Sequence, residues 1–140
     1  MADITVTAAL VGLVDPMKAD VRSYIAAATI TKGQAAYITT SGTVGVADAD
    51  DTGTRQFRGI ALNGGAAGQA IDVCHEGEVY GFTLAGNANA LVYLSNTAGA
   101  LATAGSVGGT TVVAGRIVCL ANKDLTKVLR VTTRWKADWA

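Results

Sequence analysis

The sequence has little of the chemistry that most active sites need. Its 140 residues include one histidine, two cysteines and one proline. Ser-His-Asp or Cys-His catalysis would have to use His75, and Cys74 cannot be its partner, because adjacent side chains of a strand point to opposite faces. Cys74, His75 and Cys119 lack the spacing of a closed zinc site. We therefore expect no catalytic residues, no metal, no cofactor and no enzyme activity.

Charge of one sign is also missing. Eleven basic and eleven acidic residues cancel, and charged residues make up 16% of the chain, where about 25% is usual. Non-specific nucleic-acid binding needs a clustered positive field, but acidic residues interrupt the densest basic group, at 123–136. No run approaches the roughly 18 apolar residues that span a membrane, and no basic region precedes the apolar segment 8–14. We therefore expect neither nucleic acid nor membrane as a partner, and assembly in the cytoplasm without a disulfide.

Two loops share part of the pattern of a ligand site. Residues 48–53 begin like a calcium loop, but Gly59 stands where an EF-hand carries its bidentate glutamate. Residues 64–68 are glycine-rich, but no Lys-Ser or Lys-Thr follows them as in a phosphate-binding loop. Both segments are predicted to be turns.

Short apolar runs with turn signals every 8–12 residues predict an all-β fold, either a small barrel or a sandwich. No segment has a helical apolar stripe with caps. The run 111–120 is apolar on both faces apart from Arg116, which predicts a strand buried on both sides. Residues 76–77 are predicted to form a turn between strands at 70–75 and 79–84.

One pattern occurs twice, 56 residues apart. Tyr37 and Tyr93 each begin a strand that is followed by a turn of small residues and a polar loop. Gly59 and Gly115 then lead an apolar strand, and another strand follows. A single such unit cannot bury its own apolar face, so two similar β units are predicted to pack against each other. The units span about 33–84 and 89–134.

The two ends of the chain lie outside this repeat. Residues 1–22 are predicted to form an extended N-terminal arm, and residues 23–140 a single β domain. Ile4 and Val6 alternate with polar residues such as Thr5, the pattern of a strand. This strand could complete a sheet within its own subunit or lie along a partner.

Trp135 and Trp139 lie in the last six residues, after the final predicted strand. Two interpretations remain open for them: they seal the open end of the barrel, or they anchor an interface with a partner. Together with the arm residues Ile4, Thr5 and Val6, they are the candidate contact residues of the chain.

Several short runs occur along the chain in an order shared with a known protein family. The runs are ADITVTAA at 2–9, ITKGQAAY at 30–37, VADAD at 46–50, RGIALNGGAAGQA at 58–70 and YLSNTAGAL at 93–101. Each run consists of common residues, and their order carries the comparison. On these runs the chain resembles the capsid cement, or head decoration, proteins of tailed bacteriophages, over most of its length.

The resemblance implies a small β-rich protein on the outer surface of an icosahedral head, made in the host cytoplasm. Such proteins sit between subunits of the major capsid protein and strengthen the expanded shell against internal DNA pressure. The partner would be the major capsid protein, with the N-terminal arm as the main contact. A homo-oligomer is expected as well, a trimer ahead of a dimer, because copies that meet at lattice symmetry axes can share contacts.

Two other functions are open at this point. A tail or fibre protein with receptor or glycan binding would need an aromatic platform, and its tyrosines are the candidates; binding to a glycan array would favour it. A hydrolase would use His75 and a nearby acid, and its activity would be lost in His75→Ala. A copy number in virions close to that of the major capsid protein would favour the cement function.

Overall fold

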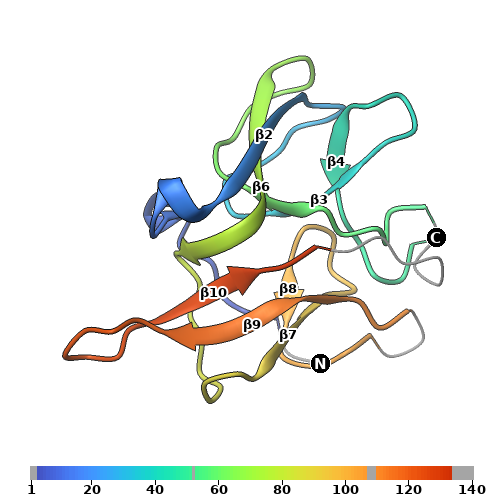
Figure 1. Cartoon of the computed structure of the whole chain (residues 1–140). Coiled ribbons are helices and arrows are strands. Elements are labelled where there is room, and N and C mark those ends of the chain that lie inside the picture. Colours follow the sequence, from blue (N-terminus) through green and yellow to red (C-terminus); the bar gives the residue numbers. More distant parts are fainter. Residues whose placement is uncertain (1–2, 52, 107–109, 134–140) are drawn as a thin grey trace.

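The computed structural model of the chain describes residues 3–51, 53–106 and 110–133. Within these ranges ten strands form a curled antiparallel sheet (Figure 1), and the only helical pieces are two short 3-10 turns. The all-β prediction is therefore confirmed. The elements are η1 (Ala8–Leu10), β1 (Gly12–Leu13), η2 (Pro16–Lys18), β2 (Asp20–Ile25), β3 (Ala35–Ile38), β4 (Val44–Val46), β5 (Gly59–Ala61), β6 (Ala70–Tyr80), β7 (Leu91–Leu94), β8 (Leu101–Ala102), β9 (Val113–Cys119) and β10 (Lys127–Val131).

The sheet consists of two similar units. Its strand order is β4-β3-β5-β6-β10-β9-β7-β8, so the second half repeats the first in reverse. Ala35 of β3 pairs with Ile60 of β5, and 56 residues later Leu91 of β7 pairs with Arg116 of β9. The β5–β6 and β9–β10 registers are related by the same shift. The duplication predicted from the sequence is therefore an approximate two-fold relation between two sheets that meet where β6 pairs with β10.

Gly59 and Gly115 have the same role in the two units. A Cβ atom on Gly59 would lie 2.2 Å from the backbone oxygen of Cys74, and one on Gly115 would lie 2.1 Å from the backbone oxygen of Arg130. Cys74 and Arg130 are again 56 residues apart. Only glycine lets the neighbouring backbones approach so closely, which explains why this residue leads the same strand in both units.

The two units bury different faces. In the first unit Ile60 and Cys74 point into the larger hydrophobic core, and their strand neighbours point into a second, smaller core. Their counterparts in the second unit, Arg116 and Arg130, are exposed. The prediction that the strand at 111–120 is buried on both sides is therefore wrong, because one face of β9 is open to solvent around Arg116.

Strand β6 runs through the segment predicted as a turn. It is continuous from Ala70 to Tyr80 and curves strongly along its length (Figure 1). Its first half pairs with β2 and β5, and its second half pairs with β1 and β10. Gly77 lies between the halves with φ +145°, next to a register shift opposite Asp20 and Val21. A bend within one strand thus replaces the predicted turn and links the two units.

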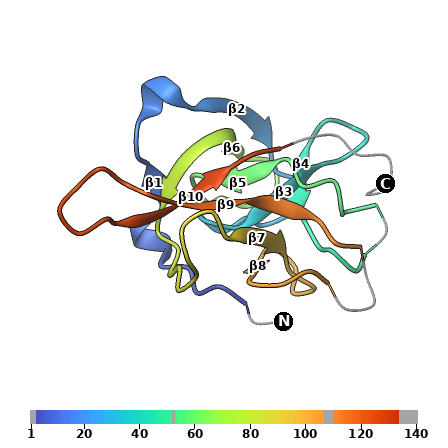
Figure 2. The same ribbon diagram turned by 60° about the horizontal axis from the view of Figure 1, so that its bottom comes forward.

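The N-terminal segment is extended, as predicted, but it is packed along the barrel. We call residues 3–25 the strap. The Ile4 amide donates to the carbonyl oxygen of Leu101 at 2.8 Å, and Asp3 bridges to Ala102, so the strap covers the edge of β8. It then passes Phe82 and continues into β1 and β2 along β6 (Figure 2). The strap therefore joins the two units.

Candidate interaction surface

The structure places the predicted contact residues differently from one another. Ile4 is 8% exposed and belongs to the larger core, and Val6 is half-buried against the same core. Thr5 is exposed, but its backbone oxygen accepts a hydrogen bond from the Thr83 amide at 2.9 Å. Of the two alternatives for this segment, the structure therefore shows the packing within its own subunit. Trp135 and Trp139 lie outside the described residues.

Apolar side chains on the surface gather elsewhere in the strap. Six large hydrophobic residues are exposed in the described ranges, and four of them lie between residues 10 and 25. Met17, in η2, is 93% exposed, and Val21 and Ile25 share one face of β2. We call Met17, Val21 and Ile25 the β2 patch. Sequence reasoning missed this surface, because alternation within Asp20–Ile25 indicates a strand but not which side is covered.

The position of β2 makes this surface available. Five of its six residues are exposed, and in the described part of the chain the strand pairs with β6 alone. Asp15 holds the preceding turn by accepting a hydrogen bond from the Met17 amide at 3.0 Å, with Pro16 in the first helical position. The Met17 side chain is thus presented by an ordered turn beside an ordered strand.

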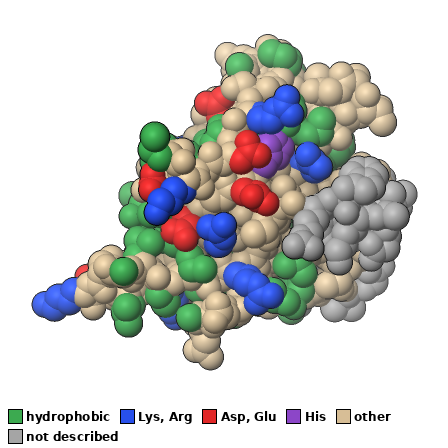
Figure 3. Space-filling model, viewed as in Figure 1, with side chains coloured by type: hydrophobic (Ala, Val, Ile, Leu, Met, Phe, Trp, Pro, Cys, Tyr) green, Lys and Arg blue, Asp and Glu red, His purple; other side chains and the backbone are tan. Residues whose placement is uncertain are grey.

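His75 is part of a structural network. Its Nδ1 atom lies against the backbone oxygen of Arg58, and because a carbonyl only accepts, Nδ1 carries the proton and donates. Nε2 therefore accepts a hydrogen bond from the Tyr24 hydroxyl at 2.7 Å. The tyrosine ring stands edge-on to the imidazole, with the centroids 5.7 Å apart. Buried in this way, His75 ties β2 to β6, and charged side chains surround it on the surface (Figure 3).

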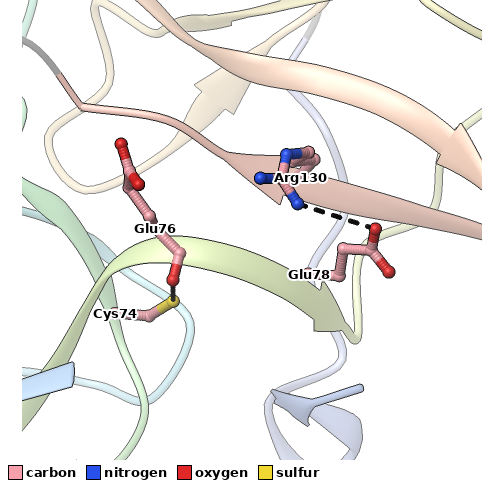
Figure 4. Close-up of polar contacts among 4 residues, drawn as sticks. All are labelled: Cys74, Glu76, Glu78 and Arg130. Atoms are coloured by element: carbon pink, nitrogen blue, oxygen red, sulfur yellow. Dashed lines mark hydrogen bonds and ion pairs between the residues drawn. The ribbon is translucent and has the colours of Figure 1, made fainter. Parts of the chain in front are cut away.

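The charged side chains on this face come mainly from β6 and β10. Glu78 and Arg130 are paired across the two strands, with 3.8 Å between Oε2 and Nη1 (Figure 4). With Asp15 and Lys18 they line a polar hollow of about 250 Å³. Both partners of the ion pair are partly exposed, so its contribution to stability is below about 1 kcal/mol.

The two cysteines differ sharply in environment. Cys74 is buried, and its thiol donates to the backbone oxygen of Glu76 at 3.3 Å (Figure 4). Burial raises the pKa of the Cys74 thiol from 9.0 to about 11, and the Asp20 and Glu76 carboxylates add to this effect. Cys119 was expected to be a buried small hydrophobe, but it is exposed at the end of β9. Neither cysteine forms a disulfide.

The folded protein should therefore react with one equivalent of a thiol reagent at about pH 8. Cys119 reacts quickly, whereas Cys74 is buried and stays protonated until its pKa of about 11 is approached. Stability should also fall as pH rises from 9 towards 11, because the unfolded thiol ionises first. Titration with Ellman's reagent, with Cys119→Ser as the control, checks this. Two rapidly reacting thiols in the folded protein would contradict it.

The two loops considered as ligand sites are occupied by their own contacts. In the acidic loop, Asp48 accepts a hydrogen bond from the Asp50 amide at 3.2 Å, and burial followed by the neighbouring Asp50 raises the pKa of Asp48. In the glycine-rich turn, the Gly65 and Gly68 amides donate to backbone oxygens. Among the described residues, no three metal-binding side chains are grouped as a site. Both segments are turns, as predicted.

Comparison of the chain with protein-family models, with curated proteins and with solved structures found no match. Within the described ranges, no helix is long and apolar enough to cross a membrane. The candidate site therefore stands on the geometry of the chain itself, and the β2 patch is its best-defined feature.

Proposed function

We propose that this chain is a capsid decoration protein of a tailed bacteriophage. It binds the outer surface of the expanded head between major capsid protein subunits and stabilises the shell against internal DNA pressure. The sequence resemblance supports this function. The structural observation that carries the docking surface is the β2 patch, an apolar surface on an exposed strand that the barrel leaves uncovered.

The β2 patch replaces Ile4, Thr5 and Val6 as the capsid contact within the N-terminal segment. Ile4 and Val6 would have to leave the core before they could reach a partner. Val21 and Ile25 need no such change, and exposed apolar side chains beside a strand edge suit contact with another protein. Net charge near zero fits a partner that is protein and not nucleic acid.

The stabilisation would be thermodynamic. A protein that binds the expanded lattice better than free subunits shifts the equilibrium towards the lattice by mass action. Each copy adds a modest interface, and many copies on one head together raise the resistance of the shell to heat and osmotic shock.

Binding to expanded empty heads tests the proposal. The Met17→Asp and Ile25→Asp double variant should bind at least about tenfold more weakly, since two apolar anchors become charged. Thr40→Asp is a matched control, because Thr40 is exposed in the turn between β3 and β4. Cosedimentation measures occupancy, and thermal melting of the heads measures reinforcement.

Unchanged occupancy of the double variant would reject the β2 patch as the docking surface. Heads that bind no wild-type protein at all, or that melt at the same temperature with and without it, would reject the decoration function itself. Circular dichroism of each variant establishes that the barrel is intact, so that loss of binding reports on the surface.

A further inference from the structure

A hairpin projects from the barrel and presents a leucine to solvent. Residues 120–126 join β9 to β10, and we call them the finger; both ribbon views show it standing clear of the body (Figures 1 and 2). Leu125 is 61% exposed and has φ +47°. A left-handed conformation costs a residue with a β-carbon roughly 1–2 kcal/mol. Glycine or asparagine would occupy this position with less strain, so the leucine side chain calls for an explanation outside the monomer fold.

The finger is held in this conformation by its own hydrogen bonds. The Asn122 side chain accepts from the Thr126 amide and donates to the Thr126 hydroxyl, both at 3.0 Å. The Leu125 amide donates to the Asn122 backbone oxygen at 3.2 Å, and the Leu120 amide donates to Thr126 at 2.8 Å. A pre-ordered loop loses little conformational entropy when it binds, which favours association.

An apolar groove lies at the base of the same finger. It has a volume of about 410 Å³ and is lined by Leu10, Tyr80, Phe82 and Lys127, among others. Leu10 is 65% exposed and Tyr80 is 39% exposed. An apolar cavity of about 150 Å³ holds benzene, so this groove has room for a leucine side chain and adjoining backbone.

We propose that Leu125 of one copy inserts into this groove of a second copy. The charges agree with this occupant, because Asp124 precedes the leucine and Lys127 lines the groove that would receive it. Thr126 and Lys127 belong both to the finger base and to the groove, so leucine and groove are neighbours on one molecule. A two-fold axis beside the fingers therefore fills both grooves at once, giving an isologous contact. This self-association is a property of the free protein and does not depend on shell binding.

The mass of the free full-length protein in solution, measured by light scattering and sedimentation equilibrium, tests the contact. We expect a dimer whose dissociation constant rises at least about tenfold in Leu125→Asn and in Leu10→Asp. Asparagine tolerates positive φ, so Leu125→Asn should melt at the same temperature or higher when monomeric. Lys123→Ala, an exposed change on the same finger, is the control and should leave the mass unchanged.

The charge pair offers a second, independent measurement. Asp124→Lys should weaken association, and Lys127→Asp added to it should restore most of the loss, which a purely structural effect on one finger would not produce. A wild-type protein that stays monomeric at the highest concentration overturns the proposal. So does a Leu125→Asn variant that assembles like wild type. A monomer whose binding to heads requires Leu125 would also overturn it and assign the finger to the shell. A trimer that requires Leu125 would overturn the two-fold arrangement.

Discussion

Replacing Gly115 with alanine is expected to lower the free energy of unfolding by about 4 kcal/mol or more. The new Cβ atom would lie 2.1 Å from the backbone oxygen of Arg130, so β9 and β10 could not keep their spacing. Gly59→Ala should be at least as damaging. Its Cβ would lie 2.2 Å from the Cys74 oxygen, and Gly59 also has φ +147°. A total stability of about 5–15 kcal/mol leaves little margin for either change.

Urea denaturation followed by circular dichroism measures both variants. Gly12→Ala in β1 is the matched control, because its Cβ would meet no atom within 4 Å and its φ is not positive. It should change stability by less than about 0.5 kcal/mol. A Gly115→Ala protein as stable as this control would show that the close strand approach, and with it the equivalence of Gly59 and Gly115, is not a constraint on the fold.

Replacing Ile4 with alanine is expected to cost about 2–4 kcal/mol. The side chain is in the larger core, and it lines the small gap beside Val92 and Ile117, where a cavity would remain. For a domain of this size each kcal/mol lowers the melting temperature by roughly 2–4 °C. Thr5→Ala is the control, because this neighbouring side chain is exposed and only the backbone of Thr5 bonds to Thr83.

This result matters for the capsid-contact hypothesis. If Ile4→Ala melts like Thr5→Ala, the strap does not stabilise the barrel, and Ile4 regains its place as a candidate contact. If Ile4→Ala is destabilised as expected, loss of head binding after deletion of residues 2–9 would report on folding. Surface variants in the β2 patch avoid this ambiguity, because Met17 and Ile25 contribute little to the core.

The repeat was visible in the sequence because it depends on local features. Gly59 and Gly115 recur at one spacing, and each precedes an apolar strand whose pairing partners follow at matching distances. Strand alternation and turn residues act within a few positions, so they remain readable without the fold. Tyr37 and Tyr93 likewise begin equivalent strands, β3 and β7 shortly before them.

The candidate surface could not be predicted in the same way. The apolar pattern of Ile4 and Val6 is the same whether the segment packs on its own barrel or on a partner, and only the hydrogen bond from Ile4 to Leu101 decides. The sequence of β2 likewise does not say that its Val21 and Ile25 face solvent. Exposure depends on which distant segments arrive on each side of a strand, and no local pattern contains that information.

By itself, the sequence determined the all-β class, the duplication and the scarcity of catalytic side chains, since these follow from composition, alternation and spacing. Only the tertiary structure decided that Ile60 is buried while its counterpart Arg116 is exposed, and that β6 bends at Gly77 without a turn. It also decided that the N-terminal segment is a strap and that Leu125 stands on a projecting finger. The physical reason is that burial is a property of contacts between remote parts of the chain, which form only when the two units and the strap pack together.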